Sequence, residues 1–251
     1  MKYTLDTLPV LDAYRENGEC PLCRLRISCE DQYVDSMLGA AYMEPDCRVK
    51  TNEVGFCTRH FELMFERRNR LGLALMTHTH MQQVTRDLKT ILSDDGSQKG
   101  LLAAFRSGKS EETRAAKIHK RLSGCVICEQ VDSTVSRYAY TIVQLYGTNA
   151  EFQRMFDSSK GFCLPHLALV LNLAQKTLPA AQADTFAKAV AAVELPNLER
   201  LSKELEWFTL KYDFRNADKP WGNSRDAVER SINKLMGACV GEEAKMPAHN
   251  D

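Results

Sequence analysis

The sequence has no excess charge of either sign, no long apolar run and no recognisable secretion signal. Its 33 basic and 33 acidic side chains balance, whereas a protein that neutralises DNA or RNA phosphates needs clustered positive charge. No apolar run approaches the ~20 residues of a membrane-spanning helix. The N-terminal stretch MKYTLDTLPVLDAYRE lacks a basic region followed by an apolar one. These absences predict a cytoplasmic protein that binds neither nucleic acid nor a membrane.

Strand-like alternation of apolar and polar residues is also missing, and apolar residues recur instead at helical intervals. The cleanest stripe covers 127–145, and another pattern predicts one long helix over 57–92. We expect Pro196 to end a helix, because a proline inside a helix loses a backbone hydrogen bond and clashes with the preceding turn. A last helix should begin near Ser224 and end at Gly237. With 44% hydrophobic residues to form a core, the sequence predicts an all-α fold.

What the sequence does have is an unusual number of cysteines. The nine are Cys20, Cys23, Cys29, Cys47, Cys57, Cys125, Cys128, Cys163 and Cys239. An odd number without a secretion signal disfavours a disulfide framework and favours metal binding or thiol chemistry.

Six of these cysteines belong to an internal repeat. The first half contains ECPLCRL and then GFCTRHFEL, and the second contains GCVICEQ and then GFCLPHLAL. The shared elements are C-x2-C and G-F-C-x2-H, at closely matched separations. Two ligands three positions apart can turn toward one point, and Cys3His is a common closed zinc set. The sequence therefore predicts two zinc ions per chain, with the ligands Cys20, Cys23, Cys57, His60, Cys125, Cys128, Cys163 and His166.

The residues around these motifs predict where they lie. Pro21 and Pro165 are typical of the first turn of a helix, so the motifs should occupy helix N-termini, where the helix dipole favours thiolates. Gly55 and Gly161 would permit the tight turn that enters each C-x2-H motif. The spacing does not decide which C-x2-C pairs with which C-x2-H, and we favour pairing within each repeat.

Other interpretations of the cysteines remain open. CPLC alone is similar to a dithiol redox pair, three Cys and one His can hold an iron–sulfur cluster, and buried cysteines can be unligated. Four protein ligands leave no open coordination position, so a zinc ion would be structural. Cys29 is expected in the core, Cys47 in a linker and Cys239 near the tail.

One further segment combines aromatic and polar residues. Residues 212–224 are expected to form an extended strap that either packs on the helices or closes over a ligand pocket. The candidate pocket residues are Tyr138, Tyr212, Asp213, Arg215, Trp221 and Asn223.

The chain is expected to divide at the polar segment 93–100. The predicted parts are a first zinc-hairpin repeat over 1–95, a second repeat with additional helices over 101–213, a strap and helix over 214–237, and a disordered tail over 238–251.

Several stretches resemble an uncharacterised bacterial family, domain of unknown function 6062. They are CPLC at 20–23, RLGLALM at 70–76, SSKGFCLPH at 158–166 and PWGNS at 220–224. The resemblance spans roughly residues 1 to 237 and implies a helical, metal-binding protein without an assigned reaction. We expect a metal-stabilised module that binds a small molecule or a protein. The alternatives are an enzyme with a pocket between the repeats under the 212–224 strap, and a thiol-based redox or metal sensor.

Overall fold

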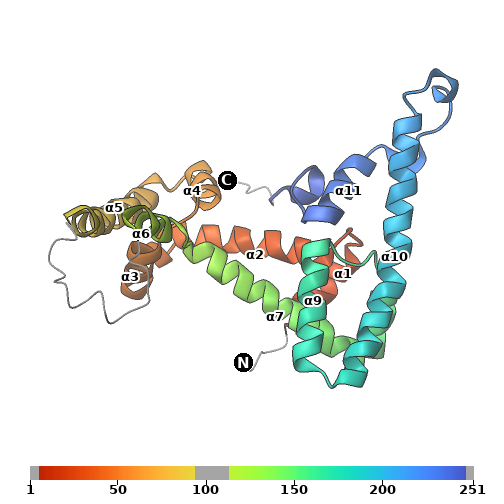
Figure 1. Ribbon diagram of the computed structural model, residues 1–251, viewed down its shortest axis with the longest axis horizontal. Helices are drawn as coiled ribbons and strands as arrows, with labels where there is room; N and C mark the ends of the chain where they lie inside the picture. The colour runs from red at the N-terminus through yellow and green to blue at the C-terminus, as the bar shows by residue number, and fades with distance from the viewer. Residues whose placement is uncertain (1–5, 94–112, 247–251) are drawn as a thin grey trace. The chain divides into compact units, whose positions relative to one another are not determined.

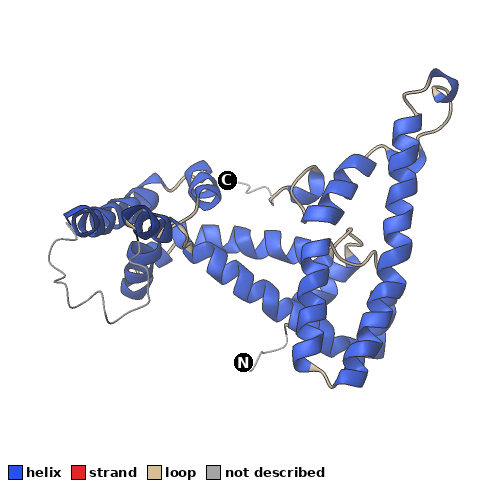
Figure 2. Ribbon diagram, in the orientation of Figure 1, coloured by secondary structure: helices blue, strands red, loops and turns tan. Residues whose placement is uncertain are grey.

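The computed structural model describes residues 6–93 and 113–246. These residues are 80% helical and contain no strand, which confirms the all-α prediction (Figure 2). Among them, no helix is both long enough and apolar enough to cross a membrane. The predicted division at residues 93–100 falls mostly outside the described residues.

The chain forms two compact units, which we call unit 1 and unit 2. Unit 1 consists of Met1–Asp31 with Val131–Asp251, and unit 2 of Gln32–Gln130. The helices α2 (Pro21–Leu38) and α7 (Val126–Thr148) cross the unit boundaries. The two sequence repeats are separated at residues 95–101, but the compact units do not coincide with the repeats. Each unit contains the C-x2-C motif of one repeat and the C-x2-H motif of the other.

Unit 1 is built around an aromatic cluster. Phe156 lies at its centre, with ring centroids 4.9 Å from Tyr146, 5.8 Å from Phe186 and 6.0 Å from Phe162. Tyr14 adds a ring 5.0 Å from Phe152. The unit's other elements are α1 (Thr7–Arg15), α8 (Ala150–Asp157), α9 (Leu164–Thr177), α10 (Ala180–Leu210), η2 (Phe214–Asn216), η3 (Gly222–Ser224), α11 (Ala227–Met236) and η4 (Glu242–Ala244) (Figure 1).

Helix α10 continues through Pro196, so the predicted break there is wrong. Pro196 and Ala192, whose carbonyl loses its hydrogen bond to the proline nitrogen, both lie on the exposed side of the helix. Water can therefore satisfy that carbonyl, and packing of the buried side against α9 and α11 keeps the helix continuous.

The last helix ends as expected and begins later. Gly237 follows α11 with φ 90°, a backbone conformation that glycine adopts without steric cost. The start is at Ala227, because Ser224 belongs to the 3₁₀ turn η3, where its hydroxyl bonds the Trp221 carbonyl at 2.6 Å.

Unit 2 has a smaller interior, in which methionines and aliphatic side chains dominate. Met64 and Met76 are almost fully buried there. Besides parts of α2 and α7, the unit contains η1 (Ala41–Met43), α3 (Pro45–Val54), α4 (Thr58–Glu66), α5 (Arg70–Ser93) and α6 (Arg114–Leu122).

The predicted long helix over 57–92 is divided into α4 and α5. Arg67 is extended (ψ 158°) and ends α4. The Asn69 side chain accepts from the Gly72 N–H at 2.8 Å and donates to the Leu38 carbonyl. Asparagine is a strong N-cap residue, so it starts a new helix at this point.

Candidate metal centres

All four motifs place their ligands at helix N-termini, as the sequence predicted. Cys57 and Cys163 are the N-cap residues of α4 and α9, and α2 and α7 begin directly after Cys20 and Cys125. In each motif the second ligand lies three positions later, in the first turn. This spacing turns the two ligand atoms toward the same point beyond the end of the helix.

The first group of ligands, which we call site A, lies wholly within unit 1. It consists of Cys20, Cys23, Cys163 and His166, all buried. His166 Nδ1 lies 3.4 Å, 3.5 Å and 3.2 Å from the sulfurs of Cys20, Cys23 and Cys163, in that order. The sulfurs of Cys23 and Cys163 are 3.5 Å apart.

The second group, site B, lies wholly within unit 2 and repeats this arrangement. It consists of Cys57, His60, Cys125 and Cys128. His60 Nδ1 lies 3.2 Å from the sulfurs of Cys57 and Cys125 and 3.4 Å from that of Cys128. The sulfurs of Cys57 and Cys128 are 3.7 Å apart.

The favoured pairing within each repeat is therefore wrong. Site A joins the C-x2-C of the first repeat to the C-x2-H of the second, and site B joins the remaining two motifs. The spacing within a motif fixes only its own two ligands, and the tertiary fold decides which motifs meet.

The donor atoms fit a single metal ion at each site. A zinc ion bound tetrahedrally at about 2.3 Å from sulfur and about 2.0 Å from nitrogen would separate sulfurs by about 3.8 Å, and sulfur from nitrogen by about 3.5 Å. The S–S separations of 3.5 and 3.7 Å and the S–N separations of 3.2–3.5 Å are close to these values. The eight residues could therefore hold one ion at each site.

Each site contains one thiol that ionises readily. Hydrogen bonds with Cys20 and Cys23 lower the pKa of Cys163 to about 4. Burial has the largest single effect and raises the pKa of Cys125, but the hydrogen bond with His60, the backbone hydrogen bonds from Cys128 and Cys57 and the nearby His60 charge together lower it to about 6. Burial raises the pKa of Cys20 and of Cys128, and the neighbouring thiols add to the increase. A cation would reverse these increases, because metal binding favours the thiolate.

Gly55 and Gly161 were predicted to permit a tight turn, and both adopt a positive φ, 77° and 78°. Each is also closely packed. A Cβ on Gly161 would lie 2.1 Å from Glu194 Oε2, and one on Gly55 would lie 2.6 Å from His80 Cε1. Both the backbone conformation and the available space therefore require glycine where the chain enters the C-x2-H motif.

A buried ion pair supports site A. Glu194 Oε2 accepts from the Phe162 N–H at 2.9 Å, and Lys234 Nζ lies 2.9 Å from Glu194 Oε1 and donates to the Lys160 carbonyl at 2.6 Å. These contacts fix the backbone that leads into Cys163. Sequence analysis missed Glu194 and Lys234, because their spacing on amphipathic helices resembles that of ordinary surface residues.

A second ionic network lies next to Cys20. The Glu19 carboxylate, 2% exposed, accepts from Arg200 at 2.7 and 3.0 Å and from Arg230 at 3.3 Å. Arg230 also donates to Glu204 at 2.6 Å. The network ties the residue before Cys20 to α10 and α11.

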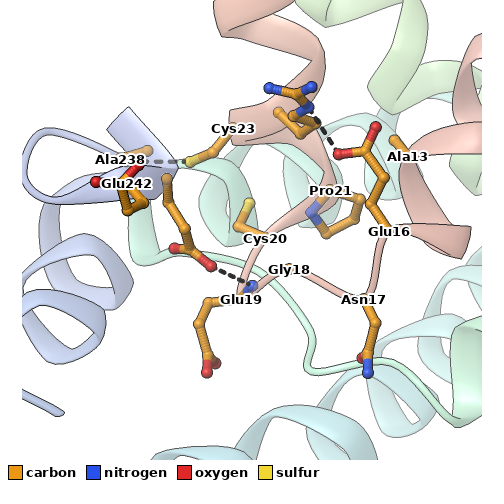
Figure 3. A pocket seen from close by; sticks show the side chains of 12 residues that line it. Ala13, Glu16, Asn17, Gly18, Glu19, Cys20, Pro21, Cys23, Ala238 and Glu242 are labelled. Carbon is orange, nitrogen blue, oxygen red and sulfur yellow. Dashed lines mark hydrogen bonds and ion pairs between the residues drawn. The ribbon is translucent and has the colours of Figure 1, made fainter. Parts of the chain in front are cut away.

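The segment after α11 covers site A. The Ala238 N–H donates to the Cys23 sulfur at 3.3 Å (Figure 3). The buried Asn233 side chain holds the segment through the Cys239 N–H at 2.9 Å, the Val240 N–H at 3.1 Å and the Val240 carbonyl at 2.9 Å. Glu243 accepts from the Glu19 N–H at 3.2 Å. Residues 238–246, predicted as part of a disordered tail, thus include the 3₁₀ turn η4 and contacts to site A.

In unit 2, polar contacts hold the backbone of the residues that precede Cys57. His80 Nδ1 lies 3.0 Å from the Asn52 carbonyl, and Arg121 donates to the same carbonyl at 2.8 Å and to the Asp87 carboxylate at 3.0 Å. The Gly55 carbonyl accepts from the Val126 N–H at 3.1 Å. The last bond joins the chain before α4 directly to the first turn of α7.

The predicted strap folds back on the end of α10. Trp207 donates to the Pro220 carbonyl at 3.1 Å, and the Phe208 ring lies 5.7 Å from that of Trp221. Lys211 Nζ donates to the carbonyls of Asn216, Ala217 and Lys219 at 2.6–2.8 Å. We call residues 207–221 the α10 tip.

The candidate pocket residues occupy different surroundings. Tyr138 lies on α7. Tyr212 is exposed at the α10 tip, where Asp213 and Arg215 form an exposed ion pair at 2.5 Å. Asn223 lines an open, charged cavity together with Arg200, Glu204 and Arg230.

The three remaining cysteines take no part in either group. Cys29 is buried, as expected, and Cys239 is exposed. Cys47 is half-buried on α3 and its sulfur contacts that of Met37 at 3.7 Å, so it lies in a helix and not in the predicted linker.

Comparison with known proteins gives a match to a protein family. Residues 1–242 match a family described as a family of unknown function, DUF6062. No curated protein and no solved structure matches the chain.

Proposed function

The chain belongs to the DUF6062 family, and we propose that it is a zinc-stabilised binding or scaffold module with one structural zinc ion at each site. The observation that carries this proposal is the convergence of four sequence motifs into two Cys3His groups with tetrahedral separations. Four protein ligands close the coordination sphere, as in structural zinc sites.

The geometry favours a single ion over an iron–sulfur cluster. The ligand atoms of each site lie within 4.8 Å of one another. A cluster places several iron and sulfide ions between its cysteines and so separates the ligands further. Three thiolates and an imidazole also match the preference of zinc for sulfur and nitrogen donors.

The two ions would act as staples between segments far apart in the chain. Site A joins residues 20–23 to 163–166, and site B joins 57–60 to 125–128. Binding free energy at such sites contributes directly to folding. Because six cysteines must stay reduced to bind metal, we place the protein in the cytoplasm.

The α10 tip supports a role in binding a protein partner. Tyr212 and Phe214 expose 77% and 86% of their surface, although the backbone around them is fixed by the three hydrogen bonds of Lys211. Exposed aromatic side chains on a preorganised backbone are typical of protein-binding hot spots.

Elemental analysis tests the metal proposal. The purified protein should contain two zinc ions per chain, and chelation should unfold it, as measured by circular dichroism. Iron with a visible chromophore, or a fold that survives complete chelation, would refute the structural-zinc role. For the tip, Tyr212→Ala with Phe214→Ala should leave zinc content and unfolding unchanged, and a large loss of stability would show that the two rings are structural.

A further inference from the structure

The two sites differ in how well their sulfurs are protected. In site A, Cys20 and Cys23 are 7% exposed and Cys163 is fully buried. Of the three cysteines of site B, only Cys125 is buried, and Cys57 and Cys128 are both half-buried. A half-open cavity of about 340 Å³ reaches Cys20 and Cys23, but these two residues expose less surface than Cys57 and Cys128.

The segment after α11 covers part of site A and so adds to the difference in protection between the two sites. Site A lies beneath Gly237 and Ala238: a Cβ on Gly237 would lie 3.9 Å from the sulfurs of both Cys23 and Cys163. The hydrogen bond from the Ala238 N–H to Cys23 also stabilises the thiolate and reduces its nucleophilicity. Asn233 holds this cover in place through three hydrogen bonds.

In site B the two half-buried cysteines are neighbours. Cys57 and Cys128 lie at the N-termini of different helices, and their sulfurs are 3.7 Å apart. Both belong to the set of thiolates that would hold the metal. Accessible thiolates next to a second thiol are the usual targets of reversible oxidation.

We propose that Cys57 and Cys128 form an oxidation-sensitive pair, which a hydroperoxide converts to a disulfide with release of zinc from site B, while site A keeps its ion. This inference rests on the proposed function, because it requires zinc at both sites. On this proposal, site A holds its zinc ion under oxidising conditions, whereas site B releases its ion on oxidation.

The chemistry balances with a hydroperoxide as oxidant. One thiolate attacks a peroxide oxygen, the O–O bond breaks, and the departing oxygen takes a proton and leaves as water or an alcohol. The resulting sulfenic acid is attacked by the second thiolate, so that an S–S bond forms, the S–O bond breaks and hydroxide leaves as water after taking a second proton. Two sulfurs lose two electrons in total and the peroxide gains them. Zinc then keeps only Cys125 and His60 and dissociates.

The experiment uses the full chain loaded with zinc, in a Cys47→Ser/Cys239→Ser background that removes the accessible thiols outside the sites. Hydrogen peroxide is added in small excess, zinc release is followed with a chromogenic chelator, and the oxidised cysteines are mapped by alkylation and mass spectrometry. We expect one zinc ion to leave at least about tenfold faster than the other, together with a Cys57–Cys128 disulfide and reduced Cys20, Cys23 and Cys163. A reductant should restore binding of the released ion.

Equal release from both sites, or oxidation of site A first, would overturn the inference and leave the proposed function standing. A purified protein that binds no zinc would instead refute the proposed function. The two failures are therefore distinguishable.

Matched variants separate access from simple loss of a ligand. Cys128→His and Cys23→His replace the second ligand of each C-x2-C motif with another zinc ligand, and zinc content is measured before oxidation. Cys128→His should slow the fast release, whereas Cys23→His should leave it unchanged. Fast release that persists in Cys128→His, with zinc bound at the outset, would show that Cys57 and Cys128 are not the reactive pair.

Discussion

Lys234 and Glu194 form an ion pair of 2.9 Å in the interior of unit 1, where their side chains are only 1% and 4% exposed. The Glu194 carboxylate also accepts a hydrogen bond from the N–H of Phe162, the residue before the candidate metal ligand Cys163. The pair therefore connects α10 and α11 to the geometry of site A.

Removal of one partner should be costly, because it leaves an uncompensated buried charge. We predict that Lys234→Met destabilises unit 1 by about 3–5 kcal/mol. The double variant Lys234→Met/Glu194→Gln should recover part of this loss. The two tryptophans of the chain, Trp207 and Trp221, both lie in unit 1, so urea unfolding followed by tryptophan fluorescence reports on this unit. An unchanged midpoint in Lys234→Met would contradict the prediction.

The two turn glycines should each control one metal site. Gly161→Ala and Gly55→Ala force a side chain into a backbone region that L residues avoid, at a cost of about 1–3 kcal/mol, and place it against Glu194 or His80. Gly161→Ala should weaken zinc binding at site A alone, and Gly55→Ala at site B alone, as measured by competition with a chelator.

Gly147→Ala is the matched control for these substitutions. It lies inside α7, where a new Cβ would meet nothing within 4 Å, so it should leave zinc binding unchanged. Helix propensity favours alanine there by about 0.5–1 kcal/mol. Equal zinc loss in all three variants would argue against a specific role for the turns.

Cys29 should be unreactive in the folded protein at neutral pH. Burial raises the pKa of its thiol to about 11, compared with about 8.5 in an unfolded chain. Folding then favours the neutral thiol, so its contribution to stability is complete below about pH 8.5 and is lost as the pH rises toward 11.

Urea unfolding of the wild type and Cys29→Ala between pH 8 and pH 11 tests this prediction. The wild type should lose stability relative to the variant over that range, and alkylation of Cys29 should accelerate over the same interval. Parallel stability profiles, or rapid alkylation of Cys29 at pH 8, would show that the thiol is not protected in the fold.

Features that depend on neighbouring residues could be predicted from the sequence. The ligand positions at helix N-termini followed from C-x2-C and C-x2-H, and the turn glycines followed from their place before each C-x2-H. The break between α4 and α5 was also readable, because Asn69 is a strong N-cap, but the apolar periodicity on both sides obscured it.

Features decided by tertiary packing could not be predicted in this way. The crossing of motifs between repeats depends on which helix ends meet, and both pairings satisfy the same spacing. The Asn233 contacts to residues 239–240 depend on a turn at Gly237, and Glu194 and Lys234 become partners only when α10 and α11 pack together. Continuation of α10 through Pro196 likewise required solvent exposure of that side of the helix.

The crossed pairing is the central claim, and zinc content in two double variants tests it most directly. Cys23→Ser/His166→Ala removes two ligands of site A, so the protein should retain one zinc ion per chain. Cys23→Ser/His60→Ala removes one ligand from each site and should lower zinc binding at both. If the first variant weakened both sites and the second kept one ion tightly bound, the ligands would pair within each repeat and the crossed arrangement would be refuted.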